Sequence, residues 1–313
     1  MNLSFILFCF LNTLFVVAVS PLFIGVVKKV KALAQGRCGP PLLQQYHNLL
    51  KLMKKETIYS SNSSWVMRAT PYINITVLIT ASLFVPLAFI PEHPFGIGNI
   101  IVFLYLLAVA RFFMALAGLD AGSTFGGMGS SREMSISSII EPITIIVFTA
   151  LVFTTNTLNL HEMFLKSASS LFLFNPTFVL TTISLFIIIL VETARVPVDN
   201  PETHLELTMV HEAMLLEYSG RDIALMELSN AVKQTLLMAI LINIIFPWGL
   251  ALEMSLIGLI IALSAFVLKG VFLSAVIGIF ESSIAKSRLF LIPNLFMIAF
   301  FLSILTIFWE VFR

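Results

Sequence analysis

Long apolar stretches alternate with short polar segments along the whole chain. Each stretch has roughly 20–27 residues, enough for a helix rising about 1.5 Å per residue to cross the ~30 Å hydrocarbon core of a bilayer. The alternating pattern of a membrane β-barrel strand is not evident. The chain is therefore predicted to be an all-α integral membrane protein, a single polytopic domain over residues 1–313 with about eight transmembrane helices. The predicted spans run roughly over residues 3–27, 71–90, 99–119, 136–158, 177–196, 224–248, 254–280 and 289–311.

Composition agrees with lipid as the main solvent. Hydrophobic residues fill 58% of the positions and charged residues only 11%, whereas soluble domains carry about 25% charged residues. The net charge is +1, so no basic surface for nucleic acid is expected. The two cysteines, Cys9 and Cys38, form no CxxC motif. This chain alone is therefore expected to hold neither an iron–sulfur cluster nor a structural metal.

Basic residues set the expected orientation. With the N-terminus outside, the inner segments hold thirteen lysines and arginines, and the outer segments hold only Lys166 and Arg313. Basic residues favour the cytoplasmic side, and an even number of spans then places both termini outside. No basic segment precedes the first apolar stretch, and Pro21 follows the one sequence that resembles a cleavage site. We therefore expect this stretch to be retained as a span.

Two inner loops stand out, at about 28–70 and 197–222. In the first, residues 41–56 carry apolar side chains at helical spacing with lysines on the other side. This pattern favours an amphipathic helix in the membrane interface, with a loop helix packed on the spans as the alternative. The Gly-rich segment 122–129 lacks the lysine and the strand–helix context of a phosphate loop, so it is expected to be an inner loop.

The second inner loop is acidic, because eight of the chain's 17 carboxylates lie between residues 192 and 227. The spacing predicts one helix over residues 201–218. Its carboxylates and histidines would occupy opposite faces, with Glu202, Glu206 and Glu217 on one and His204 and His211 on the other. A mixed metal site on this helix is therefore not expected. Adjacent carboxylates titrate as a coupled group, which suits proton storage, although charge runs are more often solvated faces.

Five ionisable residues fall within or at the ends of the predicted spans: Arg111, Glu141, Glu192, Lys233 and Lys269. A charge at the bilayer centre costs at least about 2.5–3.5 kcal/mol, so such groups face cavities, pair, or mark an ion path. We interpret Glu141 and Glu192 as part of a proton relay, the alternative being two interfacial carboxylates without a role. Lys233 is expected to pair with a carboxylate from another span. Lys269 is expected either to pair or to snorkel to the interface.

Three motifs carry a family resemblance. The most specific is V-E-T-A-R-V-P-V-D-N-P-E-T-H-L-E-L at 191–207, continued by L-E-Y-S-G at 216–220. The second is Arg132 followed by Glu141 and proline, and the third is R-C-G-P at 37–40 followed by a Lys-rich helix. Together they resemble the NADH dehydrogenase subunit 1 family of respiratory complex I and its relatives in membrane-bound NiFe-hydrogenases. The resemblance covers nearly the whole chain.

Other positions favour the hydrogenase branch of that family. Residues 280–290 read F-E-S-S-I-A-K-S-R-L-F, which is similar to a pattern of group 4 hydrogenases such as the formate hydrogenlyase and CO-linked types. After Gly39-Pro40 the Asn-Arg and second Gly-Pro usual in complex I are missing, and Val198 stands where complex I usually has Phe. These departures weigh against quinone binding.

The resemblance implies a non-catalytic anchor in the plasma (inner) membrane of a bacterium or archaeon, coupling a peripheral redox arm to ion translocation. Its implied partners are hydrogenase-like large and small subunits holding a NiFe centre and iron–sulfur clusters, antiporter-like membrane subunits, and lipid. The proton-path candidates are Glu141, Glu192, Asp199, Glu202, Glu206, Glu212, Glu217 and Lys233. The motif residues expected to shape the site are Arg37, Arg132, Arg195, Pro197, Tyr218, Glu281, Lys286 and Arg288. Three alternatives stay open: a quinone-reducing NADH dehydrogenase, a stand-alone ion transporter, and a hydrogenase-like complex whose catalytic arm has lost its metal.

Overall fold

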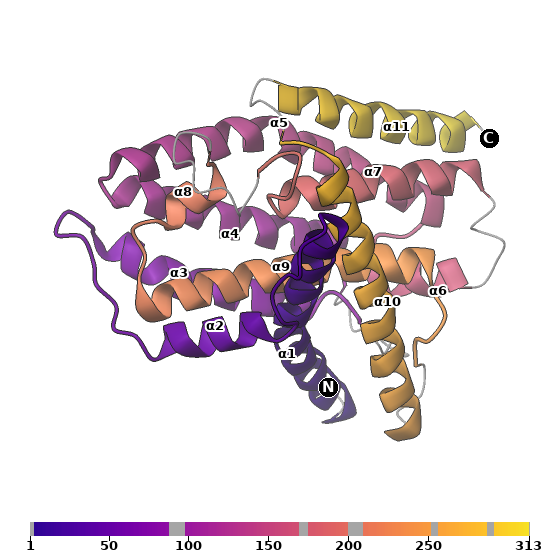
Figure 1. The fold of residues 1–313 in the computed structure, drawn as a ribbon. Helices are drawn as coiled ribbons and strands as arrows, with labels where there is room; N and C mark the ends of the chain where they lie inside the picture. Colours follow the sequence, from indigo (N-terminus) through magenta and orange to yellow (C-terminus); the bar gives the residue numbers. More distant parts are fainter. Residues whose placement is uncertain are drawn as a thin grey trace.

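The computed structural model describes residues 3–87, 98–168, 175–199, 209–251, 256–286 and 291–312. In these ranges the regular structure is helical, with one isolated β-bridge between Asn99 and Asn159. The long helices are α1 (Leu3–Ala34), α3 (Trp65–Ser82), α4 (Ile100–Asp120), α5 (Thr124–Thr155), α7 (Pro176–Glu192), α9 (Gly220–Ile245), α10 (Leu256–Ser283) and α11 (Ile292–Phe312) (Figure 1). The short helices are α2 (Gln44–Met53), α6 (Leu160–Ala168) and α8 (His211–Leu215).

The predicted all-α membrane fold is confirmed. Every predicted span overlaps one long helix, and six of the described helices are long and apolar enough to cross a bilayer, namely α1, α4, α5, α9, α10 and α11. Helix α7 is apolar but has only 17 residues. Helix α3 carries Arg68 and Asn74 within its length and is less apolar. The chain is a multi-pass membrane protein, and the count of eight spans stays a prediction.

The prediction of an inner loop at the Gly-rich segment is wrong, because these residues form the start of α5. Ser123 caps the helix, its Oγ accepting a hydrogen bond from Gly126 N at 3.0 Å. A Cβ atom added at Gly126 would lie 2.6 Å from the Gly118 carbonyl oxygen on α4. Glycine is therefore required where α4 and α5 meet. The early start of α5 also makes Arg132 and the residue after it helical.

The prediction of one helix over 201–218 is also wrong for the part that the structure describes. Within residues 209–218 only the five-residue α8 is helical. The chain turns after Leu215, and Gly220 takes a φ of +54° at the start of α9. Residues 201–208, which include Glu202, His204 and Glu206, lie outside the described residues, so the shared face of their carboxylates stays a prediction.

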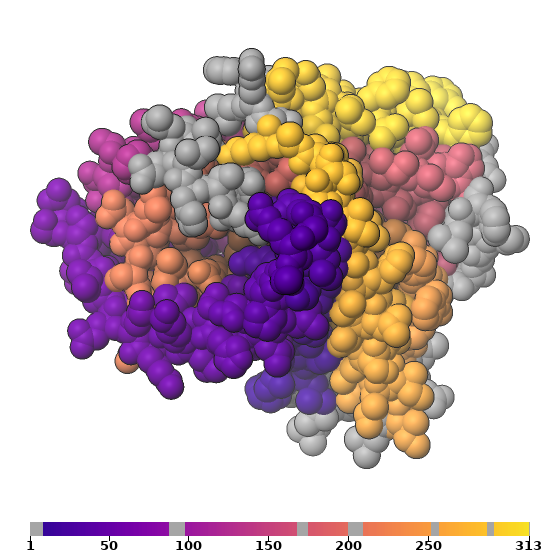
Figure 2. Space-filling view, in the orientation of Figure 1, coloured from indigo at the N-terminus to yellow at the C-terminus, as the bar shows by residue number. Residues whose placement is uncertain are grey.

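Helix α9 runs through the middle of the bundle (Figure 1), and α1, α2, α3 and α7 pack on it. Helix α1 crosses α9 steeply and packs along α10, where the ring centroids of Phe23 and Phe266 lie 6.0 Å apart. Helix α11 covers α5 and α7. Figure 2 shows α1, α2 and α10 side by side on one face of the molecule. The centre of the bundle is thus enclosed on several sides, which allows charged groups to be buried there.

Helix α2 is the amphipathic helix predicted within residues 41–56. It packs on α1 and α9, and Gln45 on its inner side is buried. The apolar side chains of Leu50 and Met53 are 61% and 45% exposed. The helix therefore packs on the spans, as one interpretation expected, and also presents an apolar edge suited to the membrane interface.

Candidate functional site

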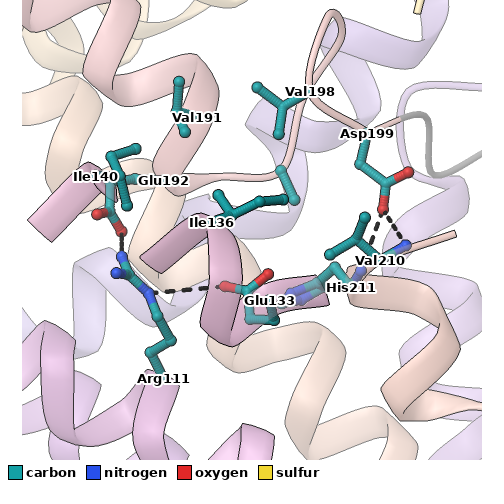
Figure 3. A pocket seen from close by; sticks show the side chains of 11 residues that line it. Arg111, Glu133, Ile136, Ile140, Val191, Glu192, Val198, Asp199, Val210 and His211 are labelled. Carbon is teal, nitrogen blue, oxygen red and sulfur yellow. Dashed lines mark hydrogen bonds and ion pairs between the residues drawn. The ribbon is translucent and has the colours of Figure 1, made fainter. Parts of the chain in front are cut away.

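A cluster of buried charges surrounds Glu192 at the end of α7 (Figure 3). Glu192 Oε2 contacts Arg111 Nη2 of α4 and lies 3.1 Å from Lys233 Nζ of α9. All three side chains are largely shielded from solvent. The expectation that Lys233 pairs with a carboxylate from another span is therefore confirmed. Removing one member of a buried pair typically costs about 3–5 kcal/mol, so these helices depend on one another.

Arg111 extends the cluster to α5. Its Nη1 lies 3.2 Å from Glu141 Oε1, and its Nε lies 3.7 Å from Glu133 Oε1. The Glu141 side chain is 48% exposed, whereas that of Glu133 is 17% exposed. With every group ionised, the cluster holds two positive and three negative charges. The surplus carboxylate gives it room to take up one proton.

The backbone at the end of α7 explains how this loop is positioned. Ala194 N donates to the Val191 carbonyl at 3.0 Å, and Arg195 N donates to the Leu190 carbonyl at 2.9 Å. This pair of hydrogen bonds is a Schellman motif, and Ala194 takes the left-handed conformation (φ +49°) that glycine usually fills. The motif ends the helix at Glu192 and turns Arg195 back toward the bundle.

Arg195 belongs to a second buried cluster on the side of α10. Glu281 Oε1 lies 3.4 Å from Arg195 Nη1, and Glu281 Oε2 lies 3.3 Å from Lys31 Nζ of α1. Arg195 Nη2 also donates to Gln234 Oε1 of α9 at 2.6 Å. Two motif residues far apart in the sequence are thus brought together, and they join α1, α9 and α10 to the start of the acidic loop.

Asp199 holds a third group together. Its Oδ1 lies 2.7 Å from Lys286 Nζ, while its Oδ2 accepts hydrogen bonds from Val210 N at 3.0 Å and His211 N at 3.1 Å. Asp199 is buried. It therefore connects the loop, the first turn of α8 and the segment after α10, and it acts here as a structural anchor as well as a candidate proton site.

Tyr218 supplies a hydrogen bond that α3 cannot make for itself. Its hydroxyl donates to the Met67 carbonyl at 3.0 Å. That carbonyl would normally bond the N–H four residues later, but residue 71 is a proline inside α3 and has no N–H. Tyr218 therefore stabilises the proline-containing helix.

The other predicted site residues are more peripheral. Arg132 Nη1 donates to the Met209 carbonyl at 2.9 Å, Pro197 is buried after a cis peptide bond, Glu217 is half-buried and Arg37 is exposed. Glu212 is half-buried at α8, where burial and then the nearby carboxylates of Glu227 and Asp199 raise its pKa to about 7. Glu202, Glu206 and Arg288 lie outside the described residues.

Lys269 does not snorkel. It is buried, and its Nζ donates to the Phe246 carbonyl at 2.7 Å and to the Trp248 carbonyl. These carbonyls follow the last residue of α9, where the negative end of the helix dipole favours a cation. Lys269 thus stabilises the end of α9.

Three cavities adjoin the Glu192 cluster. A largely apolar pocket of about 330 Å³ lies between α4 and α5 and ends at Arg111, Glu141 and Glu192. Two smaller cavities, of about 20 Å³ and 30 Å³, lie near the acidic loop and near α9. Among the described residues, no group of three or more His, Cys, Asp or Glu side chains is arranged to hold a metal ion.

Sequence reasoning missed several members of these clusters, above all Glu133, His211, Lys31 and Gln234. Glu133 was hidden because its segment was assigned to the approach to a span that begins near residue 136. The signal was present: Glu133 precedes Glu141 by eight residues, just over two helical turns, and follows the motif residue Arg132.

Comparison with known proteins agrees with this arrangement. A family model described as NADH dehydrogenase matches residues 6–311. The chain is 30% identical over 306 residues to hydrogenase-4 component C of Escherichia coli K12, covering 97% of this chain and 96% of that protein. It is 30% identical over 293 residues to formate hydrogenlyase subunit 4 of the same organism, covering 93% and 94%.

Further relatives include a complex I protein and a solved structure. A membrane subunit of the NADH-quinone oxidoreductase of Wolbachia pipientis wMel is 31% identical over 288 residues, covering 84% of this chain and 83% of that protein. A chain in the structure of the membrane-bound sulfane sulfur reductase, an archaeal respiratory membrane complex, has the same fold. It aligns with a TM-score of 0.75 at 18% identity, covering 97% of this chain and 100% of that one. The resemblance inferred from the motifs is confirmed: the chain belongs to the NADH dehydrogenase family, which includes this subunit of complex I.

Proposed function

We propose that this chain is the membrane anchor and proton-coupling subunit of a multi-subunit group 4 NiFe-hydrogenase. Two near-full-length relatives are named as hydrogenase-4 and formate hydrogenlyase subunits, which supports the hydrogenase branch. In this proposal the NiFe centre and iron–sulfur clusters lie in large and small partner subunits, and antiporter-like membrane subunits complete the ion path. The complex would sit in the plasma membrane of a bacterium or archaeon, with both termini of this chain outside.

The buried charge network around Glu192 carries the proposal. Four helices contribute to it, and it borders the loop that the redox arm would contact. Buried ionisable groups within membrane-spanning segments mark ion paths by default, because burying them without a function is costly. The chain itself performs no redox chemistry in this proposal. Its residues hold, receive and release protons.

The coupling would proceed through the eight residues from Glu192 to Asp199. A redox step in the attached arm changes the charge or position of the loop beyond Asp199. Because Asp199 is tied to Lys286 and to α8, and Glu192 to Arg111 and Lys233, a loop movement alters the proton affinity of the intramembrane carboxylates. Glu141, half-exposed toward the pocket between α4 and α5, would pass the proton toward neighbouring subunits.

The first experiment identifies the complex. The protein is extracted in mild detergent and isolated through a tag on this chain, partners are identified by mass spectrometry, and metals are assayed. Nickel together with iron and a hydrogenase-like large subunit is the expected result. Iron and flavin without nickel, with inhibitor-sensitive quinone reduction, would assign the chain to the NADH–quinone oxidoreductase type, which the 31% identical relative represents. Ion transport by the chain reconstituted alone would make it a transporter.

The second experiment tests the relay itself. Glu192→Gln and Glu141→Gln are introduced into the complete complex, and proton transport per electron is measured in proteoliposomes. Both variants are expected to lower it, while Glu56→Gln, an exposed acid, is expected to match the wild type. Unchanged transport in both relay variants would refute proton coupling through this cluster.

A further inference from the structure

The two small cavities are separated by one group of side chains. The first, of about 20 Å³, is bordered by Glu192 and Asp199, and the second, of about 30 Å³, by Asn74 and Lys233. Arg111, Glu133 and His211 line both cavities. A cavity of about 10–15 Å³ or more holds a water molecule when polar partners are present. Each cavity therefore has the size and the lining for at least one water.

The second cavity also contains an acceptor that needs a donor. Asn74 is buried, and its Oδ1 accepts no hydrogen bond from the described residues. Buried polar atoms of this kind are nearly always satisfied by protein or by ordered water. Ser229 and Asn230 line the same cavity and offer further partners. This combination of volume and chemistry points to a bound water that contacts Asn74.

Glu133 and His211 lie between the two cavities, on α5 and α8. Figure 3 shows the His211 ring directed toward the Glu133 carboxylate, with Asp199 on one side and Arg111 on the other. The His211 backbone N–H donates to Asp199 at 3.1 Å, so the position of the ring depends on the loop. The charged groups that face the pair come from four elements: Arg111 of α4, Glu192 of α7, Lys233 of α9 and Asp199 of the loop.

Resting on the proposed function, we propose that Glu133 and His211 form a water-linked bridge that carries protons between the acidic loop at Asp199 and the intramembrane cluster around Glu192. In the inward step, a water in the first cavity gives a proton to the free nitrogen of the neutral imidazole. The imidazole releases its other ring proton to the Glu133 carboxylate. The imidazole ends neutral in the opposite tautomer, the carboxylate becomes a carboxylic acid, and the water regains its proton from the loop side. Glu133 then releases the proton through the water of the second cavity.

The surroundings suit this transient role. Burial, followed by the nearby charge of Lys233, lowers the pKa of His211 to about 4. The ring is therefore neutral at rest with one free nitrogen, as a proton shuttle requires. The contact of Glu133 with Arg111, at 3.7 Å, is the longest of the three that Arg111 makes. Glu133 is thus the carboxylate of the cluster least committed to Arg111.

The test uses the complete complex in proteoliposomes, with electrons from dithionite-reduced methyl viologen and internal pH read by an entrapped dye. The variants are Glu133→Gln, Glu133→Asp and His211→Gln, with the exposed residues Glu56→Gln and His47→Gln as matched controls. Proton transport per electron is expected to fall about tenfold or more in both Gln variants, because a positioned acid or base contributes about 10²-fold or more to proton transfer. The controls are expected to match the wild type.

The Asp variant separates a proton carrier from a structural partner. Gln preserves the shape of Glu133 but cannot carry a proton, whereas Asp is shorter but can. Transport in Glu133→Asp is expected to exceed that in Glu133→Gln and to keep a pH dependence that the Gln variant lacks. The reverse order would overturn the proposal. A map of the wild-type complex that resolves ordered waters is expected to show one beside Asn74 Oδ1, and an unoccupied position there would overturn it too.

The outcomes also distinguish this inference from the proposed function. If Glu192→Gln abolishes coupling while Glu133→Gln and His211→Gln retain it, the bridge is wrong and the proposed function stands. If all three variants retain coupling, both are wrong.

Discussion

Replacing Tyr218 by phenylalanine should destabilise the protein through a helix in which Tyr218 does not lie. The hydroxyl of Tyr218 is the hydrogen-bond donor to the Met67 carbonyl of α3, at 3.0 Å, and both residues are buried. The intrahelical donor for that carbonyl is missing because residue 71 is proline. In Tyr218→Phe the carbonyl would lose its donor without regaining water. A buried polar group left in this state costs about 1–3 kcal/mol.

A second substitution provides an internal control. Pro71→Ala places an N–H at the position that can donate to the Met67 carbonyl, so the carbonyl no longer depends on Tyr218. In this background Tyr218→Phe is expected to cost well under the value in the wild type. The double-mutant cycle should therefore give a coupling energy of about 1–2 kcal/mol, within the range for residues that share one hydrogen-bond network. Tyr105→Phe, in an exposed tyrosine of α4, should change stability by no more than about 0.5 kcal/mol.

The assay is the apparent Tm of the detergent-solubilised protein, followed by fluorescence-detected size-exclusion chromatography after heating. By size scaling, 1 kcal/mol corresponds to about 2–4 °C for a chain of 150–250 residues and somewhat less for a longer one. Tyr218→Phe should then lower the Tm by several degrees in the wild-type background and little in the Pro71→Ala background. Equal losses in the two backgrounds would refute the argument that the tyrosine replaces the missing N–H.

Three further predictions follow from the buried charges and the close helix contacts. Glu281→Gln leaves two buried cations facing each other and should cost about 3–5 kcal/mol, seen as a lower Tm, and a Tm equal to the wild type would contradict the ion-pair assignment. Glu212 has a pKa raised from 4.5 to about 7, so the stability it contributes is present below about pH 4.5 and is lost as the pH rises through about 7. Glu212→Gln should therefore flatten the Tm–pH curve over that interval and raise the Tm above it, and an unchanged curve would count against this assignment. Gly278→Leu should separate α1 from α10, because even a Cβ atom would lie 2.9 Å from the Val27 carbonyl oxygen; overpacking of this kind costs about 1–3 kcal/mol, and a wild-type Tm would contradict the close approach.

The sequence was sufficient to predict the membrane fold because burial in lipid imposes a simple requirement. Every span must be long, apolar and helical, and all eight apolar stretches overlap helices. The need of Lys233 for a carboxylate from another span was predicted on the same grounds, since an isolated intramembrane cation is costly. Which carboxylate it finds could not be predicted, because Glu192 lies 41 residues away in sequence and their distance depends on the packing of α7 against α9.

The failures have equally specific causes. A 3.6-residue period in a short loop fits a helix that the tertiary contacts do not allow: residues 209–218 turn to place Tyr218 against α3 and the first turn of α8 against Asp199. The Gly-rich segment was predicted to be a loop from composition alone, whereas glycine was needed for the close approach of α4 and α5. Glu133 and His211 carried no motif, and only the arrangement of three helices around them reveals what they face.

The position of Glu192 explains why the acidic loop and the membrane cluster act as one unit. Glu192 is the last residue of α7, where the negative end of the helix dipole disfavours a carboxylate by about 0.3–1 kcal/mol. Arg111 and Lys233 must offset this cost, so any movement of α4 or α9 away from Glu192 raises its affinity for a proton. Three residues further on Arg195 is fixed to α9 and α10, and four residues beyond that Asp199 is fixed to α8. A displacement of the loop cannot be absorbed by a flexible linker over so short a distance, and it must therefore change the ion pairs of Glu192.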